Sequence, residues 1–281
     1  MLLPLIALIS AVPGQDAGGP PSAIPGSTAP SPTAPSPTAP SNEQRIAHAS
    51  NIGRLIYGFD RAAWVSTDAL LAAVPKDQLT GVGGYVVEVS DEQTLHVTYY
   101  RGTNTTAQAF FVADVRGGKV VRQEQLPQPI ALTPSQAFLA HAREVALERA
   151  KAQKYEPCTP APFNTVVLPS PNGGPVAVYL LTAQQDAATY VMGGNYRVVV
   201  APDGHVLSSR PFNVSCLAMK RPKLPPGATA EGFMTTHLLD PVPTEIHVFT
   251  SYNMHMPLFV ATAAKTVWEV KDSAITLAPI K

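Results

Sequence analysis

The stretch Thr133–Lys154, TPSQAFLAHAREVALERAKAQK, carries the strongest structural signal in this chain of 281 residues. Thr133 and Gln136 have the spacing of a capping box, and Pro134 occupies the first helical position, where its missing N–H is not needed. One helical face is traced by Phe138, Ala142, Val145, Ala146 and Arg149. The helix dipole also favours the cations near the other end, Lys151 and Lys154. The stretch therefore predicts a helix.

Runs rich in β-branched and aromatic residues lie on both sides of this helix, separated by turn residues, as antiparallel strands require. The strands expected before the helix are 84–89, 95–100, 110–115 and 119–122. Those expected after it are 165–168, 176–181, 196–200 and 205–208. Gly117-Gly118 supplies the positive φ of a hairpin turn, and Pro202-Asp203-Gly204 is a turn tripeptide. The last fifty residues add further strands.

A second helical region precedes the first group of strands. Ser41 and Gln44 form a capping box before apolar and small residues at helical spacing, Ile46, Ala49, Gly53 and Ile56. Asp60 or Ser66 is expected to begin a further short helix with Trp64, Leu70, Leu71 and Val74. Pro75 should end it, because proline disfavours helix in the residue before it.

A helix followed by hairpins thus occurs twice. The predicted fold class is α+β, with helices packed on curved antiparallel β-sheets. The folded region is expected to cover residues 42–281, either as one domain or as two helix-plus-hairpin modules with a sub-boundary near residue 130.

The first 41 residues have a different composition. MLLPLIALISA is apolar but shorter than the ~20 residues that span a bilayer, and small residues follow it, so residues 1–17 are expected to be a secretory signal peptide. Because no Lys or Arg precedes the apolar run, either translation starts upstream or export is inefficient. Residues 18–41 are uncharged and rich in Pro, Ser, Thr and Ala, which predicts a disordered linker.

The two cysteines, Cys158 and Cys216, bear on the compartment. An isolated pair in an exported protein is most simply a disulfide, whereas a metal-binding pair or two free thiols are the alternatives. Neither cysteine belongs to a CxxC motif or has a neighbouring histidine. The sequence therefore predicts a Cys158–Cys216 disulfide and a periplasmic or extracellular location.

Candidate chemistry gathers in residues 236–249, THLLDPVPTEIHVF. Two prolines argue against a helix, and a β-hairpin turning at Asp240–Pro243 is expected, with Ile246 and Val248 toward the core. A four-residue turn separates the histidines, whereas a turn of odd length brings three possible zinc ligands together: His237, Glu245 and His247. The metal-free hairpin is the favoured interpretation.

The formal net charge of zero and the charged fraction of 14% give no long-range attraction for nucleic acid. No membrane span is expected in the mature chain, and P-loop, G-x-S-x-G and G-x-G-x-x-G motifs are absent from the sequence. Met254-His255-Met256 suits copper chemically, but methionine more often fills a core. The sequence predicts an exported, non-enzymatic binding or structural module without cofactor, whose partner is an unidentified protein or envelope component. The alternative is a metal-assisted hydrolase using His237, Glu245 and His247.

Overall fold

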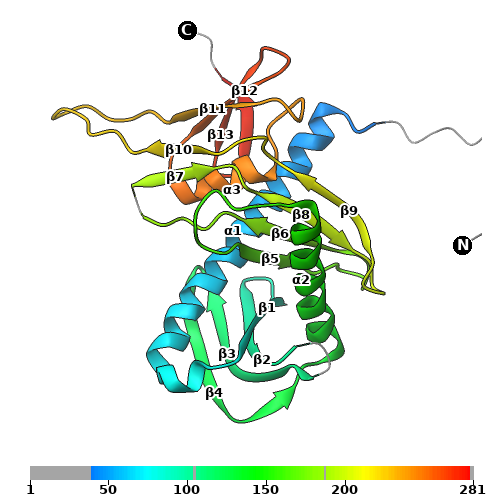
Figure 1. Ribbon diagram of the computed structural model, residues 1–281. Helices are drawn as coiled ribbons and strands as arrows, with labels where there is room; N and C mark the ends of the chain where they lie inside the picture. Colours follow the sequence, from blue (N-terminus) through cyan, green and yellow to red (C-terminus); the bar gives the residue numbers. More distant parts are fainter. Residues whose placement is uncertain (1–38, 104–105, 187, 279–281) are drawn as a thin grey trace, which may run out of the picture. The chain divides into compact units, whose positions relative to one another are not determined.

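The computed structural model describes residues 39–103, 106–186 and 188–278, and Figure 1 labels its elements. The predicted signal peptide and nearly all of the predicted linker lie outside the described residues. The described residues form helices and mainly antiparallel sheets, so the α+β fold class is confirmed. Residues Pro40–Lys281 form a single unit.

The first helix, α1 (Asn42–Ala73), begins at the predicted capping box. The Gln44 N–H donates to Ser41 Oγ at 3.2 Å, and the Ser41 N–H donates to Gln44 Oε1 at 2.8 Å. The separate short helix predicted from Asp60 or Ser66 is wrong, because α1 continues through both positions. Ser66 Oγ donates to the Ala62 carbonyl one turn earlier at 2.7 Å, so its hydroxyl is satisfied without capping a new helix.

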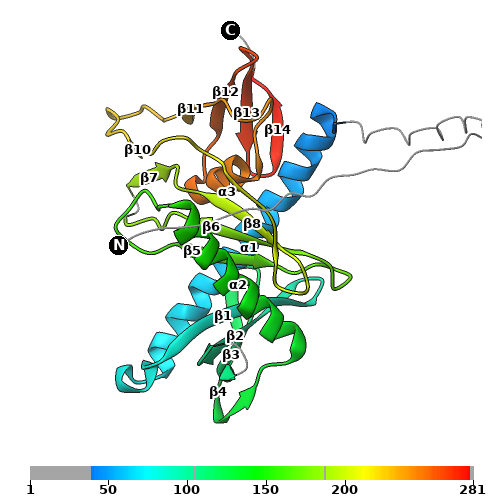
Figure 2. The same cartoon turned by 45° about the vertical axis from the view of Figure 1, so that its right-hand side comes forward.

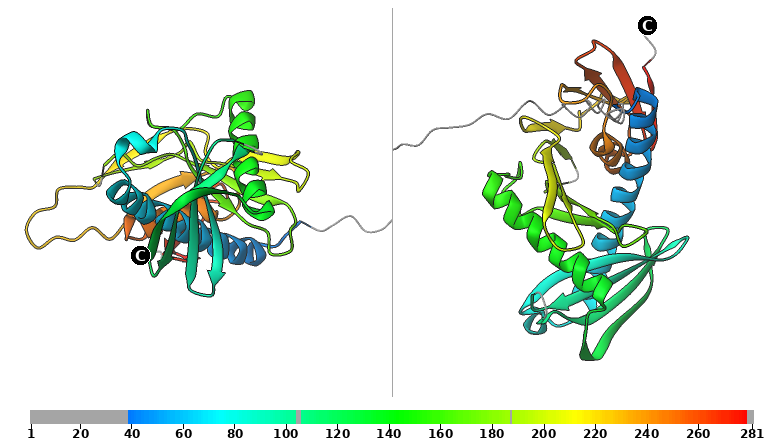
Figure 3. Two further views of the ribbon diagram at one scale, coloured as in Figure 1. Left: turned by 90° about the horizontal axis from the view of Figure 1, so that it is seen from below. Right: turned by 90° about the vertical axis from the view of Figure 1, so that its right-hand side faces the viewer.

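After a short 3-10 helix (Lys76–Leu79), four strands form an antiparallel meander. They are β1 (Val82–Asp91), β2 (Thr94–Arg101), β3 (Gln108–Arg116) and β4 (Lys119–Ala131). Gly117 and Gly118 make the β3–β4 turn with φ of 57° and 71°, as predicted. Register shifts interrupt all three pairings, and such bulges bend a sheet. Figure 3 shows the resulting twist.

The predicted helix of the opening stretch is α2 (Pro134–Gln153), with the Thr133–Gln136 capping box in place. Its buried residues are Leu139, Ala140, Ala142, Ala146 and Ala150, so the buried face is shifted slightly from the predicted one. α2 contacts a second antiparallel sheet in the order β5-β6-β8-β9 and also touches β1. These strands are β5 (Asn164–Leu168), β6 (Val176–Leu181), β8 (Tyr196–Val200) and β9 (Val206–Pro211).

The two helix-plus-sheet modules share one core. Phe111 of β3, Tyr179 of β6 and Ile56 of α1 belong to a single cluster of buried residues. α1 also passes both sheets and reaches the C-terminal strands, as Figure 2 shows from a second side. The long helix therefore ties the modules together.

A two-stranded sheet pairs β7 (Thr189–Met192) with β10 (Leu217–Lys220). The predicted disulfide is confirmed beside it: Cys158 is bonded to Cys216, with Cα atoms 5.6 Å apart. Gly193 and Gly194 both have positive φ and lie against Cys158, at distances that leave no room for a side chain. The bond fixes the connection after α2 to the start of β10.

The hairpin predicted for residues 236–249 is wrong, because the second half of this stretch is helical. β11 (Phe233–His237) ends at the first histidine, and α3 (Glu245–Met254) begins after both prolines. Proline disrupts the interior of a helix, but before the first turn no intrahelical N–H is needed. The two prolines therefore set the approach to a helix and not a hairpin turn.

α3 is the crossover between two parallel strands. β11 pairs in parallel with β12 (Leu258–Thr262), and a parallel pair cannot be joined by a tight turn. The remaining strands, β13 (Val267–Lys271) and β14 (Ala274–Leu277), continue the sheet antiparallel. No described helix has the length and apolarity needed to cross a membrane.

Candidate functional site

The three candidate metal ligands separate into two environments. His237 and His247 are buried, and their rings meet edge to face with centroids 4.6 Å apart. Glu245 Oε1 instead accepts hydrogen bonds from Tyr179 Oη at 3.1 Å and from Arg197 Nη1 at 2.9 Å. Within the described parts of the chain, no group of three or more His, Cys, Asp or Glu side chains is placed to hold a metal ion.

His247 has a structural task at the start of α3. Its Nδ1 accepts the backbone N–H of Thr244 at 3.0 Å. Burial, with a smaller contribution from the neighbouring His237, lowers the pKa of His247 to about 3, against the smaller opposite effects of Asp240 and Thr244. The imidazole is therefore neutral at physiological pH and acts as an acceptor in a capping box.

Residues of the same stretch line a cavity of about 380 Å³ together with the first turns of α1. Arg210 and Asp240 form two bonds across it, at 2.9 and 2.6 Å, and His237 Nε2 lies 2.9 Å from the same carboxylate. Burial alone would raise the pKa of Asp240, but the hydrogen bonds from His237 and Arg210 outweigh it and hold that pKa well below its usual range. Arg197 is paired with Glu245 as well, so one ion pair joins α3 to β8 and the other joins the segment before α3 to β9. The charges of this cavity are therefore largely paired within the protein.

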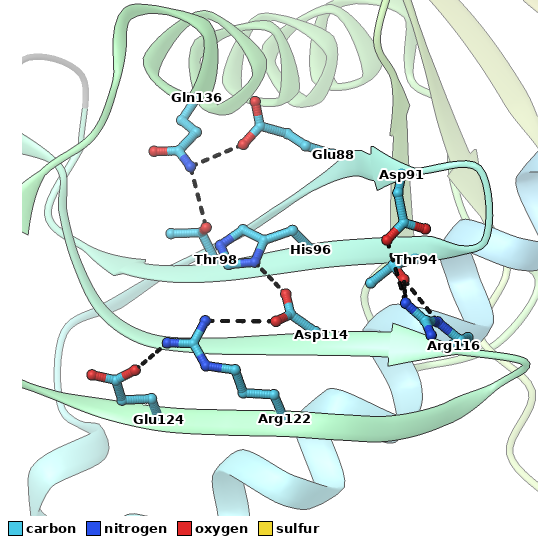
Figure 4. Close-up of polar contacts among 10 residues, drawn as sticks. All are labelled: Glu88, Asp91, Thr94, His96, Thr98, Asp114, Arg116, Arg122, Glu124 and Gln136. Atoms are coloured by element: carbon cyan, nitrogen blue, oxygen red, sulfur yellow. Dashed lines mark hydrogen bonds and ion pairs between the residues drawn. The ribbon is translucent and has the colours of Figure 1, made fainter.

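A second polar cluster covers the face of the β1–β4 sheet opposite α1 (Figure 4). His96 Nδ1 lies 2.6 Å from Asp114, whose other oxygen is 3.6 Å from Arg122. Glu88 accepts a hydrogen bond from Gln136 at the N-terminus of α2 at 2.9 Å. Each charge in this cluster has a partner in the sheet or in α2, which is the arrangement of a solvated sheet face.

The remaining large cavity, about 360 Å³, lies where α1, α3 and the second sheet meet; we call it the α1–α3 cleft. α1 contributes residues of one helical face, at spacings of three and four: Asp60, Ala63, Trp64, Thr67 and Asp68. α3 contributes Phe249, Thr250 and Asn253. β1, the second sheet and the β7 region contribute Tyr85, Asn164, Leu181, Thr182, Ala183, Gln184, Tyr190, Val191 and Asn195.

Asp60 is the carboxylate of the α1–α3 cleft whose pKa is raised. It is partly shielded from solvent and makes no hydrogen bond or ion pair with any described residue. Burial raises the pKa of Asp60 to about 6, and the charge of the adjacent Arg61 reduces this shift only in part. A desolvated carboxylate in a cleft, without a partner among the described residues, marks a candidate functional site.

The helical face that lines the cleft crosses the position where the sequence predicts a new helix. In one continuous helix, Asp60, Trp64 and Asp68 share a face at i, i+4 and i+8, although 58% of Trp64 is exposed. A helix start at Asp60 or Ser66 divides this face between two elements, so the sequence does not indicate the cleft.

No family model, no curated protein and no solved structure matches this chain. The cleft itself therefore carries the functional argument.

Proposed function

We propose that the protein is an exported, non-enzymatic binding module that holds a small ligand in the α1–α3 cleft. The observation that carries this proposal is a cavity of about 360 Å³ lined by aromatic side chains and by carboxylates that pair with no other described residue. Ligand sites are typically concave and ~300–1,000 Å³ in volume. The cleft has that size, and its lining is more polar than that of most ligand pockets.

Export is proposed from the sequence together with the disulfide. The Cys158–Cys216 bond is of a kind that persists in oxidising compartments, the periplasm and the extracellular space. The apolar start and the uncharged Pro/Ser/Thr/Ala-rich segment add a signal peptide and a linker. We infer a module held at a distance from its attachment point, with a protein or another envelope component as its partner.

The alternative, a metal-assisted hydrolase of His237, Glu245 and His247, would require Glu245 to leave Arg197 and Tyr179. It would also require His247 to give up the cap of α3. Both changes break buried hydrogen bonds, so the binding module is the better-supported function.

Tryptophan fluorescence tests the binding module directly. The chain has two tryptophans, and a Trp268→Phe variant leaves Trp64 as the only reporter. Amines, saccharides and short peptides are titrated separately, and at least one class should give a saturable change in Trp64 emission. Calorimetry should then show weaker binding of that class to Trp64→Ala and Asn253→Ala variants. If no class changes the emission at millimolar concentration, or both variants bind normally, the cleft is not a ligand site.

A further inference from the structure

We propose that the ligand of the α1–α3 cleft is a small organic cation, an ammonium or guanidinium compound, held by Asp60 against the aromatic wall. This inference rests on the proposed function and names its ligand class. It is carried by the hydrogen-bonding capacity, the charge and the aromatic content of the cleft.

Several donors of the cleft are occupied by the protein, whereas the side-chain amides of Asn164, Asn195 and Asn253 donate to no described residue. Tyr85 Oη donates to the Thr165 carbonyl at 3.0 Å, Thr67 Oγ1 to the Ala63 carbonyl at 2.7 Å, and Thr250 Oγ1 to the Ile246 carbonyl at 2.7 Å. Gln184 likewise donates to the Asp186 carbonyl at 2.7 Å.

The carboxylates of the cleft are without donors from the protein. Asp60, which is half-buried, and Asp68, which is exposed, accept no hydrogen bond from any side chain or backbone group that the structure describes. A carboxylate offers about four acceptor sites. A ligand that pairs with these two groups must therefore supply donors.

The charge of the cleft agrees with this conclusion. Its lining contains two aspartates and, among the residues described, no Lys, Arg or His. Three arginines act beside the lining: Arg61 lies over the Trp64 ring at 5.5 Å from the centroid, Arg221 lies over the Tyr190 ring, and Arg143 donates to Thr165 and Gly83. None of them forms an ion pair with Asp60 in the described structure, and a cationic ligand would supply that pair.

Aromatic side chains complete the recognition. Trp64, Tyr85 and Phe249 line the same cavity as Asp60, and Tyr190 on the far wall already receives the guanidinium of Arg221 at 5.8 Å from its ring centroid. The negative face of an aromatic ring attracts an organic cation, which a carboxylate beside the ring also attracts. A bare metal ion would use the carboxylate but not the rings, which is why an organic cation fits better.

The titration of Asp60 gives the binding a pH dependence. Because burial raises the pKa of Asp60 to about 6, the carboxyl is partly protonated below that pH and loses its charge. The groups that act on it are Arg61 on α1 and Tyr85 on β1, with Asp68 two turns along the helix. Affinity for a cation should therefore rise between pH 5 and 7.5, on the order of tenfold, as Asp60 ionises.

The test is calorimetry on the full chain with three cations: choline, n-butylammonium and agmatine. Two of them are paired with a neutral molecule of similar shape, 3,3-dimethylbutan-1-ol for choline and n-butanol for butylammonium, and agmatine is compared with both alcohols. At least one cation should bind, about tenfold or more tighter than its neutral counterpart, and Asp60→Asn should remove that preference. Asp77→Asn alters an exposed aspartate of the 3-10 helix and should leave binding unchanged. Thermal unfolding of both variants confirms that they are folded.

The outcomes separate this inference from the proposed function. If a saccharide or a neutral peptide binds in a manner lost in Trp64→Ala and Asn253→Ala, whereas no cation binds, the cleft is a ligand site but the cation is wrong. If a cation binds equally well to Asp60→Asn, Asp60 is not its anchor and the inference fails. If nothing binds at millimolar concentration, both proposals fail.

Discussion

Thr244 and His247 cap one another across the first turn of α3: the Thr244 N–H donates to His247 Nδ1 at 3.0 Å, and Thr244 Oγ1 lies 3.1 Å from the same nitrogen. A histidine stands where a capping box usually has Glu or Gln, and only its neutral form can accept the bond. The arrangement fixes the crossover between the parallel strands β11 and β12.

Replacing His247 with alanine should lower the free energy of unfolding by about 2–4 kcal/mol, because a buried side chain and a helix cap are lost together. His247→Gln keeps an acceptor at the third helical position and should lose less. Urea denaturation measures both changes, and His205→Ala, at a side chain that is 60% exposed, is the matched control. A His247→Ala variant as stable as the control would contradict the capping role.

The same residues show what the sequence could and could not predict. Ile246 and Val248 were expected in the core and are buried, but on a helix and not on a strand. Short apolar runs do not distinguish the two, and the prolines at 241 and 243 were assigned to a turn when they precede a helix. The burial of the apolar residues was therefore predictable from side-chain type, whereas the burial of Glu245 and His247 was not. The element depended on a histidine cap that pattern rules do not include.

The strands and the starts of the two long helices were easier to predict from the sequence, because each carries its own local signals. Thr133, Pro134 and Gln136 mark the start of α2 without reference to the rest of the chain. The cleft could not be found in this way, since Asp60 and Asn253 come together only when α1 packs against α3. Its chemistry is a consequence of tertiary packing.

The close approach of α1 and α3 depends on Gly53. A Cβ at this position would collide with the side chain of Val248 and with the Glu245 carbonyl, 2.6 Å away. Gly53→Ala should therefore destabilise the protein by about 1–3 kcal/mol. Gly58 lies in the same helix with nothing within 4 Å of an added Cβ, so Gly58→Ala should stabilise it by about 0.5–1 kcal/mol. If thermal unfolding shows that Gly53→Ala destabilises the protein and Gly58→Ala stabilises it, the close approach of α1 and α3 at Gly53 is confirmed. Equal effects of the two substitutions would contradict it.

The Cys158–Cys216 disulfide closes a sequence separation of 58 residues. Replacing both cysteines with serine should lower the free energy of unfolding by about 4 kcal/mol, mainly because the unfolded chain gains freedom. Chemical denaturation of the variant and of the unreduced protein measures the difference. Thiol titration of the unfolded, unreduced protein should find no free thiol, and two titratable thiols would refute the bond in the isolated protein.

If the Asp60 carboxylate pairs with a ligand and not with the protein, its charge should lower the free energy of unfolding of the ligand-free protein at neutral pH. Its pKa is raised to about 6 in the folded chain, against an ordinary value of 3.8, so the folded state binds the proton more tightly than the unfolded state does. Stability from this group is thus full below pH ~4 and is lost as the pH rises through ~6. A difference of about two pKa units between the folded and the unfolded state corresponds to about 2–3 kcal/mol of unfolding free energy at most. Solvent that enters from the cleft reduces that figure.

Asp60→Asn removes the ionisation and keeps the shape of the side chain. The variant should be more stable than the wild-type protein at pH 7, by about 1–2 kcal/mol, and nearly equal to it at pH 4. His247 acts in the opposite direction, since its lowered pKa makes stability fall as the pH drops from ~6.5 toward ~3 in both proteins, so only the difference between them isolates Asp60. Urea denaturation at a series of pH values gives that difference. A variant less stable than the wild type at pH 7 would mean that the Asp60 carboxylate is held by the fold and not reserved for a cation.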